Sequence, residues 1–164
     1  MKKIEPLRLA TLNDLEKKDC RDIAQAINPL LADTFALFVK TKNFHWHMSG
    51  PHYRDYHLLL DDQSDQIFAM IDVLAERVRK LGERTIQSIS QIKALQSIEE
   101  VDKIFSAEEM LNNLLQDNKN FLIRMRGVHE VCGKRNDVAT TSILENYIDE
   151  TEQRIWFLFE TLAK

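Results

Sequence analysis

Large apolar residues recur at the spacing of an α-helix along most of this chain. The first clear stripe starts near residue 30 and runs from apolar side chains into a polar end, through Leu31, Phe35, Phe38, Lys42 and His45. Asn28-Pro29 supplies an N-cap and a proline at the first helical position, and Gly50-Pro51 stops the helix. We therefore predict a helix over residues 30–49, preceded by a separate or kinked helical piece at residues 19–27.

A second helix is predicted over residues 53–81, because this stretch has no interior glycine or proline and Gly82 follows it as a C-terminal cap. Its apolar positions near one face are Leu60, Phe68, Ile71, Ala75 and Val78. Residues 84–98 then form a connection that contains one short helix.

Ser106 and Glu109 have the spacing of a capping box and start a third helix, which reaches about residue 131. A break within residues 132–141 separates it from a fourth helix that continues to the C-terminus. The apolar positions of the fourth helix available for a core are Ile143, Ile148, Ile155, Leu158 and Leu162. Four long helices with a lengthy middle connection and short outer ones predict an all-α four-helix bundle.

Composition agrees with one domain of long helices. The 164 residues suit a single domain, with residues 1–27 as a partly helical N-terminal segment and residues 28–164 as the bundle. Hydrophobic residues make up 44% and charged residues 29%, which excludes a disordered chain. The 4 glycines and 3 prolines are too few for the many turns of a β-sandwich.

The net charge and the cysteine residues indicate which binding partners and which cellular compartment to expect. The formal net charge of −4 repels nucleic acid and favours cations. Cys20 and Cys132 lack metal or redox spacing, so we expect free buried thiols. No run of eighteen apolar residues predicts a membrane span, and we expect a cytoplasmic protein.

Histidine is concentrated around the first helix break, where the stretch FHWHMSGPHYRDYH holds four of the five histidines. His57 and Asp61 form one i,i+4 pair, and Asp72 and Glu76 form another, a spacing that lets two side chains reach one ion. On a helical wheel all four lie within about 100 degrees. Because Phe68 shares that face, we expect the carboxylates to be partly buried and to need a cation.

Folding the hairpin around Gly50-Pro51 brings His45 to the height of His57 and adds an imidazole to the set. Either i,i+4 pair alone is most often a solvated or salt-bridged surface pair, but the combination favours a metal site. Carboxylates with imidazoles suit iron better than a closed structural zinc site, while manganese and zinc remain alternatives. The chain contains no Glu-x-x-His, so the usual di-iron site inside one bundle is absent.

The motif KTKNFHWHMSGPHYRDYHLLLDD, followed by IDVLAERVRKLGE, resembles the signature of the Dps family, the ferritin-like DNA-binding proteins from starved cells. The match is specific over residues 40–83. The resemblance implies a ferritin-like bundle and identifies the metal ligands as His45, His57, Asp61, Asp72 and Glu76. In that family Glu76 would bridge two iron ions, and Trp46 would exchange an electron during oxidation; packing is an equal alternative for Trp46.

The resemblance also implies a hollow homododecamer built from twofold dimers. Such a shell oxidises Fe(II), preferentially with hydrogen peroxide, stores the ferric mineral inside and so protects against oxidative stress. His47 departs from the family pattern, and we place His47, His52 and His129 outside the site. In the family, iron enters through acidic pores near the start of the last helix, and Asp137 is the nearest candidate for such a pore here.

Nonspecific DNA binding is the alternative function. It requires several Lys or Arg contacts to phosphate. The N-terminal segment carries basic residues, but Glu5 and Asp14 dilute them and the whole chain is acidic, so the sequence does not favour DNA as a partner.

Distance along the second helix gives a separate prediction about assembly. Asp61 and Asp72 are eleven residues apart, or roughly 16 Å at the rise of an α-helix, whereas two catalytic metals lie about 4 Å apart. An antiparallel second copy would set His57 and Asp61 of one chain opposite Asp72 and Glu76 of the other, with the twofold axis near residues 66 and 67. The site is then shared between two subunits.

Overall fold

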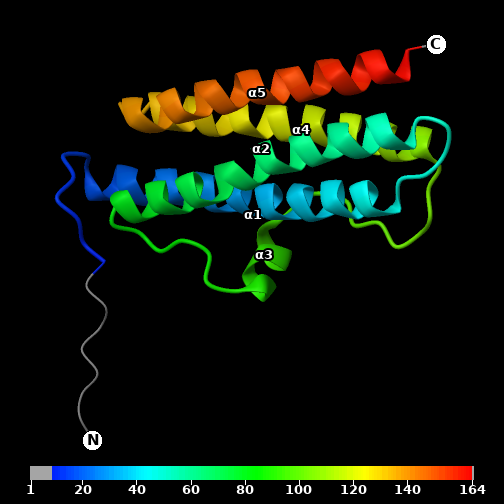
Figure 1. Ribbon diagram of the computed structural model, residues 1–164. Coiled ribbons are helices and arrows are strands. Elements are labelled where there is room, and N and C mark those ends of the chain that lie inside the picture. The colour runs from blue at the N-terminus through cyan, green and yellow to red at the C-terminus, as the bar shows by residue number, and fades with distance from the viewer. Residues whose placement is uncertain (1–8, 164) are drawn as a thin grey trace, which may run out of the picture.

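The computed structural model describes residues 9–163, and within them the chain forms four long helices and one short one (Figure 1). The helices are α1 (Lys17–His47), α2 (Tyr53–Lys80), α3 (Ile89–Leu95), α4 (Ala107–Gly133) and α5 (Val138–Leu162). No strand occurs in the described residues. The predicted all-α bundle with a short helix in its middle connection is confirmed.

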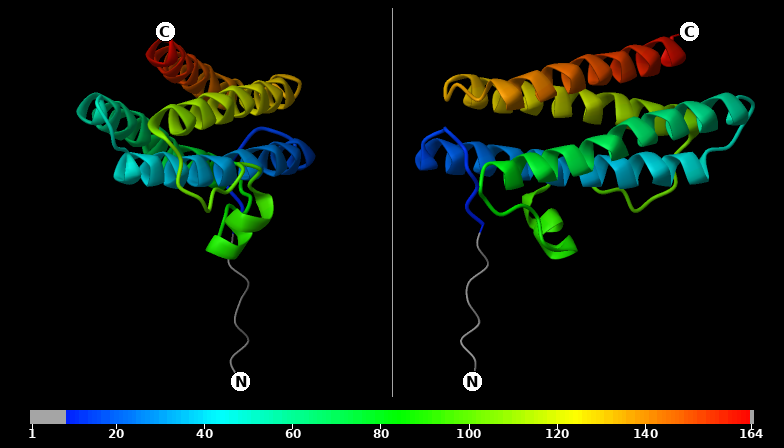
Figure 2. Two further views of the ribbon diagram at one scale, coloured as in Figure 1. Left: turned by 90° about the vertical axis from the view of Figure 1, so that its right-hand side faces the viewer. Right: turned by 60° about the vertical axis from the view of Figure 1, so that its left-hand side comes forward.

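The bundle has two layers. Helices α1 and α2 form one hairpin, α4 and α5 form the other, and α3 lies on the side of α1 that faces away from α5 (Figures 1 and 2). Gly50 adopts a φ of 109°, which an L side chain rarely tolerates, and its carbonyl accepts the Tyr53 N–H at 3.0 Å. This turn holds the end of α1 beside the start of α2.

Residues 19–27 are helical as predicted, but they are part of α1 and not a separate helix. Helix α1 runs without a break from Lys17, and Pro29 lies inside it. An interior proline costs about 3 kcal/mol, but the apolar stripe continues on both sides of it. Ile23, Ile27 and Leu30 are each at most 2% exposed. Their burial offsets the lost hydrogen bond.

The predicted helix ends are largely confirmed. Ser106 and Glu109 form a complete capping box at the start of α4. Gly82, with a φ of 81°, directly follows the last residue that caps α2. Both cysteines are free and buried, as expected.

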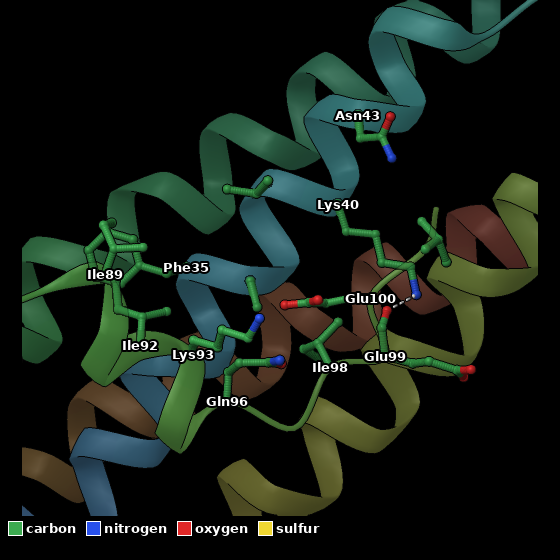
Figure 3. Close-up of a pocket in the computed structure, with 13 residues that line it drawn as sticks. Phe35, Lys40, Asn43, Ile89, Ile92, Lys93, Gln96, Ile98, Glu99 and Glu100 are labelled. Atoms are coloured by element: carbon green, nitrogen blue, oxygen red, sulfur yellow. Dashed lines mark hydrogen bonds between the residues drawn. The ribbon is translucent and has the colours of Figure 1, made fainter. Parts of the chain in front are cut away.

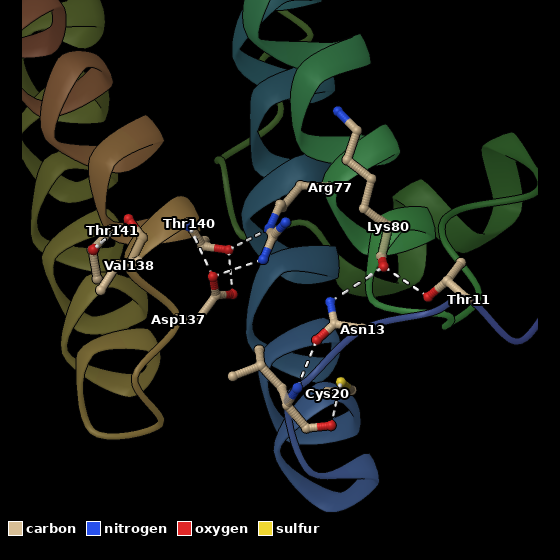
Figure 4. Close-up of polar contacts among 10 residues, drawn as sticks. Thr11, Asn13, Cys20, Arg77, Lys80, Asp137, Val138, Thr140 and Thr141 are labelled. Carbon is tan, nitrogen blue, oxygen red and sulfur yellow. Dashed lines mark hydrogen bonds and ion pairs between the residues drawn. The ribbon is translucent and has the colours of Figure 1, made fainter.

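Asp137 is a structural residue in this chain. It is 2% exposed, caps the start of α5 through the Thr140 N–H at 3.0 Å, and pairs with Arg77 of α2 at 2.7 Å (Figure 4). Arg77 also donates from Nε to the Thr140 hydroxyl at 2.7 Å. These contacts occupy the Asp137 carboxylate within one chain, and its assignment to an iron entry pore stays a prediction.

The core is mainly apolar but also holds buried polar side chains, of which Arg154 is the largest. Arg154 of α5 is 1% exposed and donates to Asn118 of α4 at 3.0 Å and to Gln66 of α2 at 3.4 Å. Burial lowers the pKa of this guanidinium to about 10, so it stays charged at neutral pH. It thereby links both layers.

Candidate metal centre

The α1–α2 turn brings His45 and His57 into direct contact. His45 lies in the last turn of α1 and is buried, and His57 lies in the first turns of α2 and is half-buried. Their rings stack with centroids 3.7 Å apart and planes inclined by 21°. The predicted equal height of the two histidines is confirmed.

Each imidazole is fixed by the backbone of the other residue. His45 Nδ1 lies 2.8 Å from the His57 carbonyl oxygen, and His57 Nδ1 lies 3.0 Å from the His45 carbonyl oxygen. A carbonyl oxygen only accepts, so both Nδ1 atoms must donate a proton. In the neutral rings both Nε2 atoms then carry a free lone pair, which is the tautomer that binds metals.

Asp61 completes one half of the candidate site. Its Oδ1 atom lies 3.7 Å from His45 Nε2 and 2.5 Å from the Lys42 ammonium. The hydrogen bond from Lys42 lowers the pKa of the Asp61 carboxyl, so this group is an anion at neutral pH. Lys42 thus provides the positive charge that the predicted site required. From the sequence, Lys42 was identified only as a member of the helical stripe.

Asp72 and Glu76 lie farther along α2 and do not join this group. Both are exposed, and Glu76 pairs with Lys80 at 3.4 Å. Phe68, expected to mark a buried face, is 58% exposed. The expectation of partly buried carboxylates is wrong for Asp72 and Glu76 within one chain, whereas Asp61 is partly buried. The buried face of α2 instead carries Leu60, Ile67, Met70, Leu74 and Val78. Within residues 9–163, no three His, Cys, Asp or Glu side chains come together closely enough to hold a metal ion.

The remaining histidines stay outside this group. His47 is exposed, and its Nδ1 lies 2.8 Å from the carbonyl oxygen of Asn43. His52 packs on Tyr56 with ring centroids 5.6 Å apart. His129 lies 3.0 Å from a Glu145 oxygen across the α4–α5 hairpin.

Two redox-active aromatic residues flank the pair. Trp46 is 66% exposed, and Tyr53 packs on the His57 ring with centroids 5.1 Å apart. The position of Tyr53, one helical turn before His57, could have signalled this contact, because residues at i and i+4 share a helix face. Sequence reasoning missed it.

We expect Lys42→Met to strengthen metal binding by about fivefold, because a half-exposed ion pair contributes about 1 kcal/mol and a bound cation must compete with it for Asp61. Calorimetric titration with Co(II), an ion that is not oxidised in air under these conditions, measures the change. Lys134→Met removes an exposed i,i+4 ion pair with Glu130 at 2.6 Å, far from the site, and should leave Co(II) affinity unchanged. Weaker binding in the Lys42 variant would show that Lys42 supports the site instead of competing for it.

A cavity of about 420 Å³ lies on the opposite side of α1, beneath α3 and the loop that follows it (Figure 3). Its walls are mainly apolar and include Phe35, Ile92 and Ile98. The Lys40 ammonium at its edge already donates to the Glu99 carbonyl oxygen at 3.0 Å and pairs with Asp117 at 2.6 Å. Among the described residues no histidine or cysteine lines this cavity, so the histidine pair is the better candidate for metal chemistry.

The arrangement of helices and the histidine–carboxylate group at the α1–α2 turn define a ferritin-like protein. The family model of the ferritin-like domain matches residues 24–164. A low-temperature-induced protein of Nostoc is 33% identical over 83% of this chain and 77% of its own length. DNA protection during starvation protein 2 of Bacillus anthracis is 25% identical over 84% of this chain and 94% of its own length.

Among solved structures, the Dps protein of Vibrio cholerae superposes with a TM-score of 0.89 and 25% identity, over 96% of this chain and 99% of that one. It is described as a member of a broad superfamily of ferritin-like diiron-carboxylate proteins. This chain belongs to the Dps family. Among residues 9–163, none of the helices combines the length and apolar character that a membrane crossing needs.

Proposed function

We propose that this protein is a ferroxidase and iron store of the cytoplasm, which oxidises Fe(II) preferentially with hydrogen peroxide and keeps the ferric mineral inside a hollow homododecamer. Membership of the family supports iron storage or DNA protection in general. The observation that carries the choice of iron chemistry is the His45–His57 pair, whose two Nε2 lone pairs are preset for a metal beside the Asp61 anion.

Two iron ions per site fit the ring geometry. The stacked imidazole rings have centroids 3.7 Å apart and planes inclined by only 21°, so one ion at a bond length of about 2.1 Å does not fit in the planes of both rings. Each histidine would therefore bind its own ion, with Asp61 near both. An ion bound to Asp61 must displace the Lys42 ammonium from this carboxylate, so we expect Lys42 to weaken iron binding.

A second copy of the chain would supply the remaining ligands. His45, His57 and Asp61 of one subunit would face Asp72 and Glu76 of its antiparallel partner, and Glu76 would bridge the ions. The exposed Phe68 lies between the two halves on α2 and packs against Phe38 of α1 with ring centroids 5.1 Å apart. Leu58 and Val73 of α2 are exposed as well, and several large apolar side chains left open along this helix support a covering partner.

Stopped-flow absorbance tests this proposal directly. The protein is loaded anaerobically with Fe(II) and mixed with hydrogen peroxide or with oxygen, and formation of ferric iron is followed in time. We expect faster oxidation than in buffer with either oxidant, and a faster rate with peroxide. Rates equal to those of free Fe(II) would refute the proposed ferroxidase, and zinc retained by the purified protein would favour a silent site.

We expect His45→Ala to slow iron oxidation strongly and His47→Ala to leave it nearly unchanged. His45 is buried against His57, while His47 is rotated by about 200 degrees around the helix and is exposed. The same stopped-flow assay compares the two variants, and circular dichroism checks that both remain helical. Equal defects would contradict the assignment of His45 as the ligand.

Nonspecific DNA binding is the second candidate, because several relatives are named for DNA protection during starvation. Residues 1–8, which hold part of the basic N-terminal segment, lie outside the described residues. A gel-shift titration at low and moderate salt separates the functions. DNA retention that survives moderate salt and disappears when residues 1–21 are deleted would favour the DNA role over iron chemistry alone.

A further inference from the structure

Helix α3 covers a cavity that its own side chains do not fill. In the described chain no residue of α3 is buried, and α3 contacts no helix other than α1. Hydrogen bonds nevertheless hold the chain on both sides of α3. Asn28 donates to the Arg84 carbonyl oxygen at 3.0 Å, and the Ser97 N–H donates to Asp33 at 2.5 Å. The cavity of about 420 Å³ is therefore a built part of the fold, and its volume lies in the range of small-molecule sites, about 300–1,000 Å³.

Three polar groups that line this cavity lack a partner. The Gln96 Oε1 atom is buried and accepts no hydrogen bond within residues 9–163. Within the same residues, neither the Lys93 ammonium nor the Glu100 carboxylate forms an ion pair, with the other or with a third group (Figure 3). The Glu99 side chain points away from both (Figure 3). An apolar cavity thus carries a cation, an anion and a hydrogen-bond acceptor that the described chain leaves unused.

Simpler ligands would leave part of this set unsatisfied. A hydrocarbon would cover the Gln96 oxygen without giving it a donor. An apolar carboxylate would meet the Glu100 anion, and an apolar amine would meet the Lys93 cation, each without a compensating charge of its own. A short molecule with an apolar body, an ammonium and a carboxylate satisfies all three groups. The cavity therefore matches a zwitterion better than a singly charged ligand.

We propose that this cavity binds a free α-amino acid with an apolar side chain, for which leucine is the probe. The leucine side chain would pack on the apolar walls of the cavity. Its ammonium would donate to Gln96 Oε1 and pair with Glu100, and its carboxylate would pair with Lys93. The cavity lies on the side of α1 opposite the histidine pair, so this binding does not depend on the proposed ferroxidase.

Equilibrium dialysis of the full-length protein against isotopically labelled leucine tests the proposal, with unlabelled compounds as competitors. We expect a single leucine per chain at saturation. Because each buried methylene strengthens binding about fourfold, leucine should bind about fiftyfold more tightly than alanine. Isopentylamine and isocaproate keep the apolar body of leucine, but each lacks one of its charged groups. Both should bind about fivefold more weakly than leucine, which is the effect of a half-exposed ion pair.

Variants of two exposed side chains separate the charge contacts. Lys93→Met should weaken leucine binding about fivefold without weakening isopentylamine, whereas Glu100→Gln should weaken both without weakening isocaproate. Lys18→Met is the control, because Lys18 lies roughly 26 Å along α1 from Phe35 and should affect no ligand. Ala36→Phe fills the cavity and should abolish leucine binding, and circular dichroism checks that each variant remains helical.

Other outcomes overturn the proposal. Leucine binding that is equal in the wild type and in both charge variants, or that persists in Ala36→Phe, would place leucine elsewhere. Equal binding of leucine and alanine would show that the apolar walls are not used. Absence of bound leucine at millimolar concentration would show that the cavity is only a gap in the packing. Stopped-flow iron oxidation is measured separately, so each of these results leaves the ferroxidase proposal untouched.

Discussion

The double variant Asp72→Asn/Glu76→Gln is expected to lose fast iron oxidation and to keep its helices. If these residues are ligands, the metal loses two anionic groups, including the bridging one, whereas each new side chain is nearly the same size. Stopped-flow oxidation with peroxide should then fall to the rate of free Fe(II). The matched control Asp149→Asn/Glu160→Gln makes the same change of charge on α5, where both residues are exposed, and should oxidise iron normally.

The same double variant should be almost as stable as the wild type without metal. Asp72 and Glu76 are like charges at i,i+4 spacing, and relief of their repulsion opposes loss of the exposed Glu76–Lys80 pair. Each contribution is at most about 0.5 kcal/mol, which corresponds to a change of about 2 °C or less in melting temperature for a chain of this size. Unchanged initial rates would refute the ligand assignment, and a fall of many degrees would reveal a structural role.

The helices could be predicted because their signals are local. Periodic apolar residues, the Ser106–Glu109 capping box and glycine at positions 50 and 82 each act within a few residues of where they stand. The predicted start of α1 was wrong because Pro29 is a local signal for the beginning of a helix. The burial of Ile23 and Ile27 outweighs this signal, and that burial depends on the other layer of the bundle. Tertiary packing decided that end.

The candidate site was predictable as a set of residues but not as a geometry. Spacing brought His45 level with His57, but it could not show that each ring would bond to the backbone of the other residue. The spacing also could not show that Lys42 of α1 would donate a hydrogen bond to Asp61 of α2. Contacts of this kind depend on side-chain direction and on the exact crossing of α1 and α2.

The face of α2 that carries the acids shows why burial was misjudged. Phe68 shares that face with Asp72, and an apolar residue beside charges suggested a buried face. In one chain the core side of α2 lies elsewhere, at Ile67 and Leu74, and Phe68 is exposed. A periodic pattern cannot distinguish a helix face that packs inside the chain from a face that a second copy of the chain would cover. An experiment on mixed assemblies can distinguish a site within one chain from a site shared by two chains.

Two inactive chains are therefore expected to restore activity when they assemble together. One chain carries His45→Ala/His57→Ala and the other carries Asp72→Asn/Glu76→Gln. If each site takes its histidines from one subunit and its distal acids from the partner, a mixed dimer has one fully intact site and one with every lesion. Equal mixing gives mixed dimers in about half of all pairs, so activity should recover to about a quarter of the wild-type value.

The measurement needs proof of mixing and a second pair of chains. Native mass spectrometry of differently tagged chains, unfolded and refolded together, counts the mixed assemblies, and each chain refolded alone gives the baseline. Asp61→Asn can replace the histidine double variant where loss of the His45–His57 contact prevents folding, because it leaves both imidazoles in place. If every site were built within one chain, all sites in the mixture would stay broken, so verified mixed assemblies without recovered activity would refute the shared site.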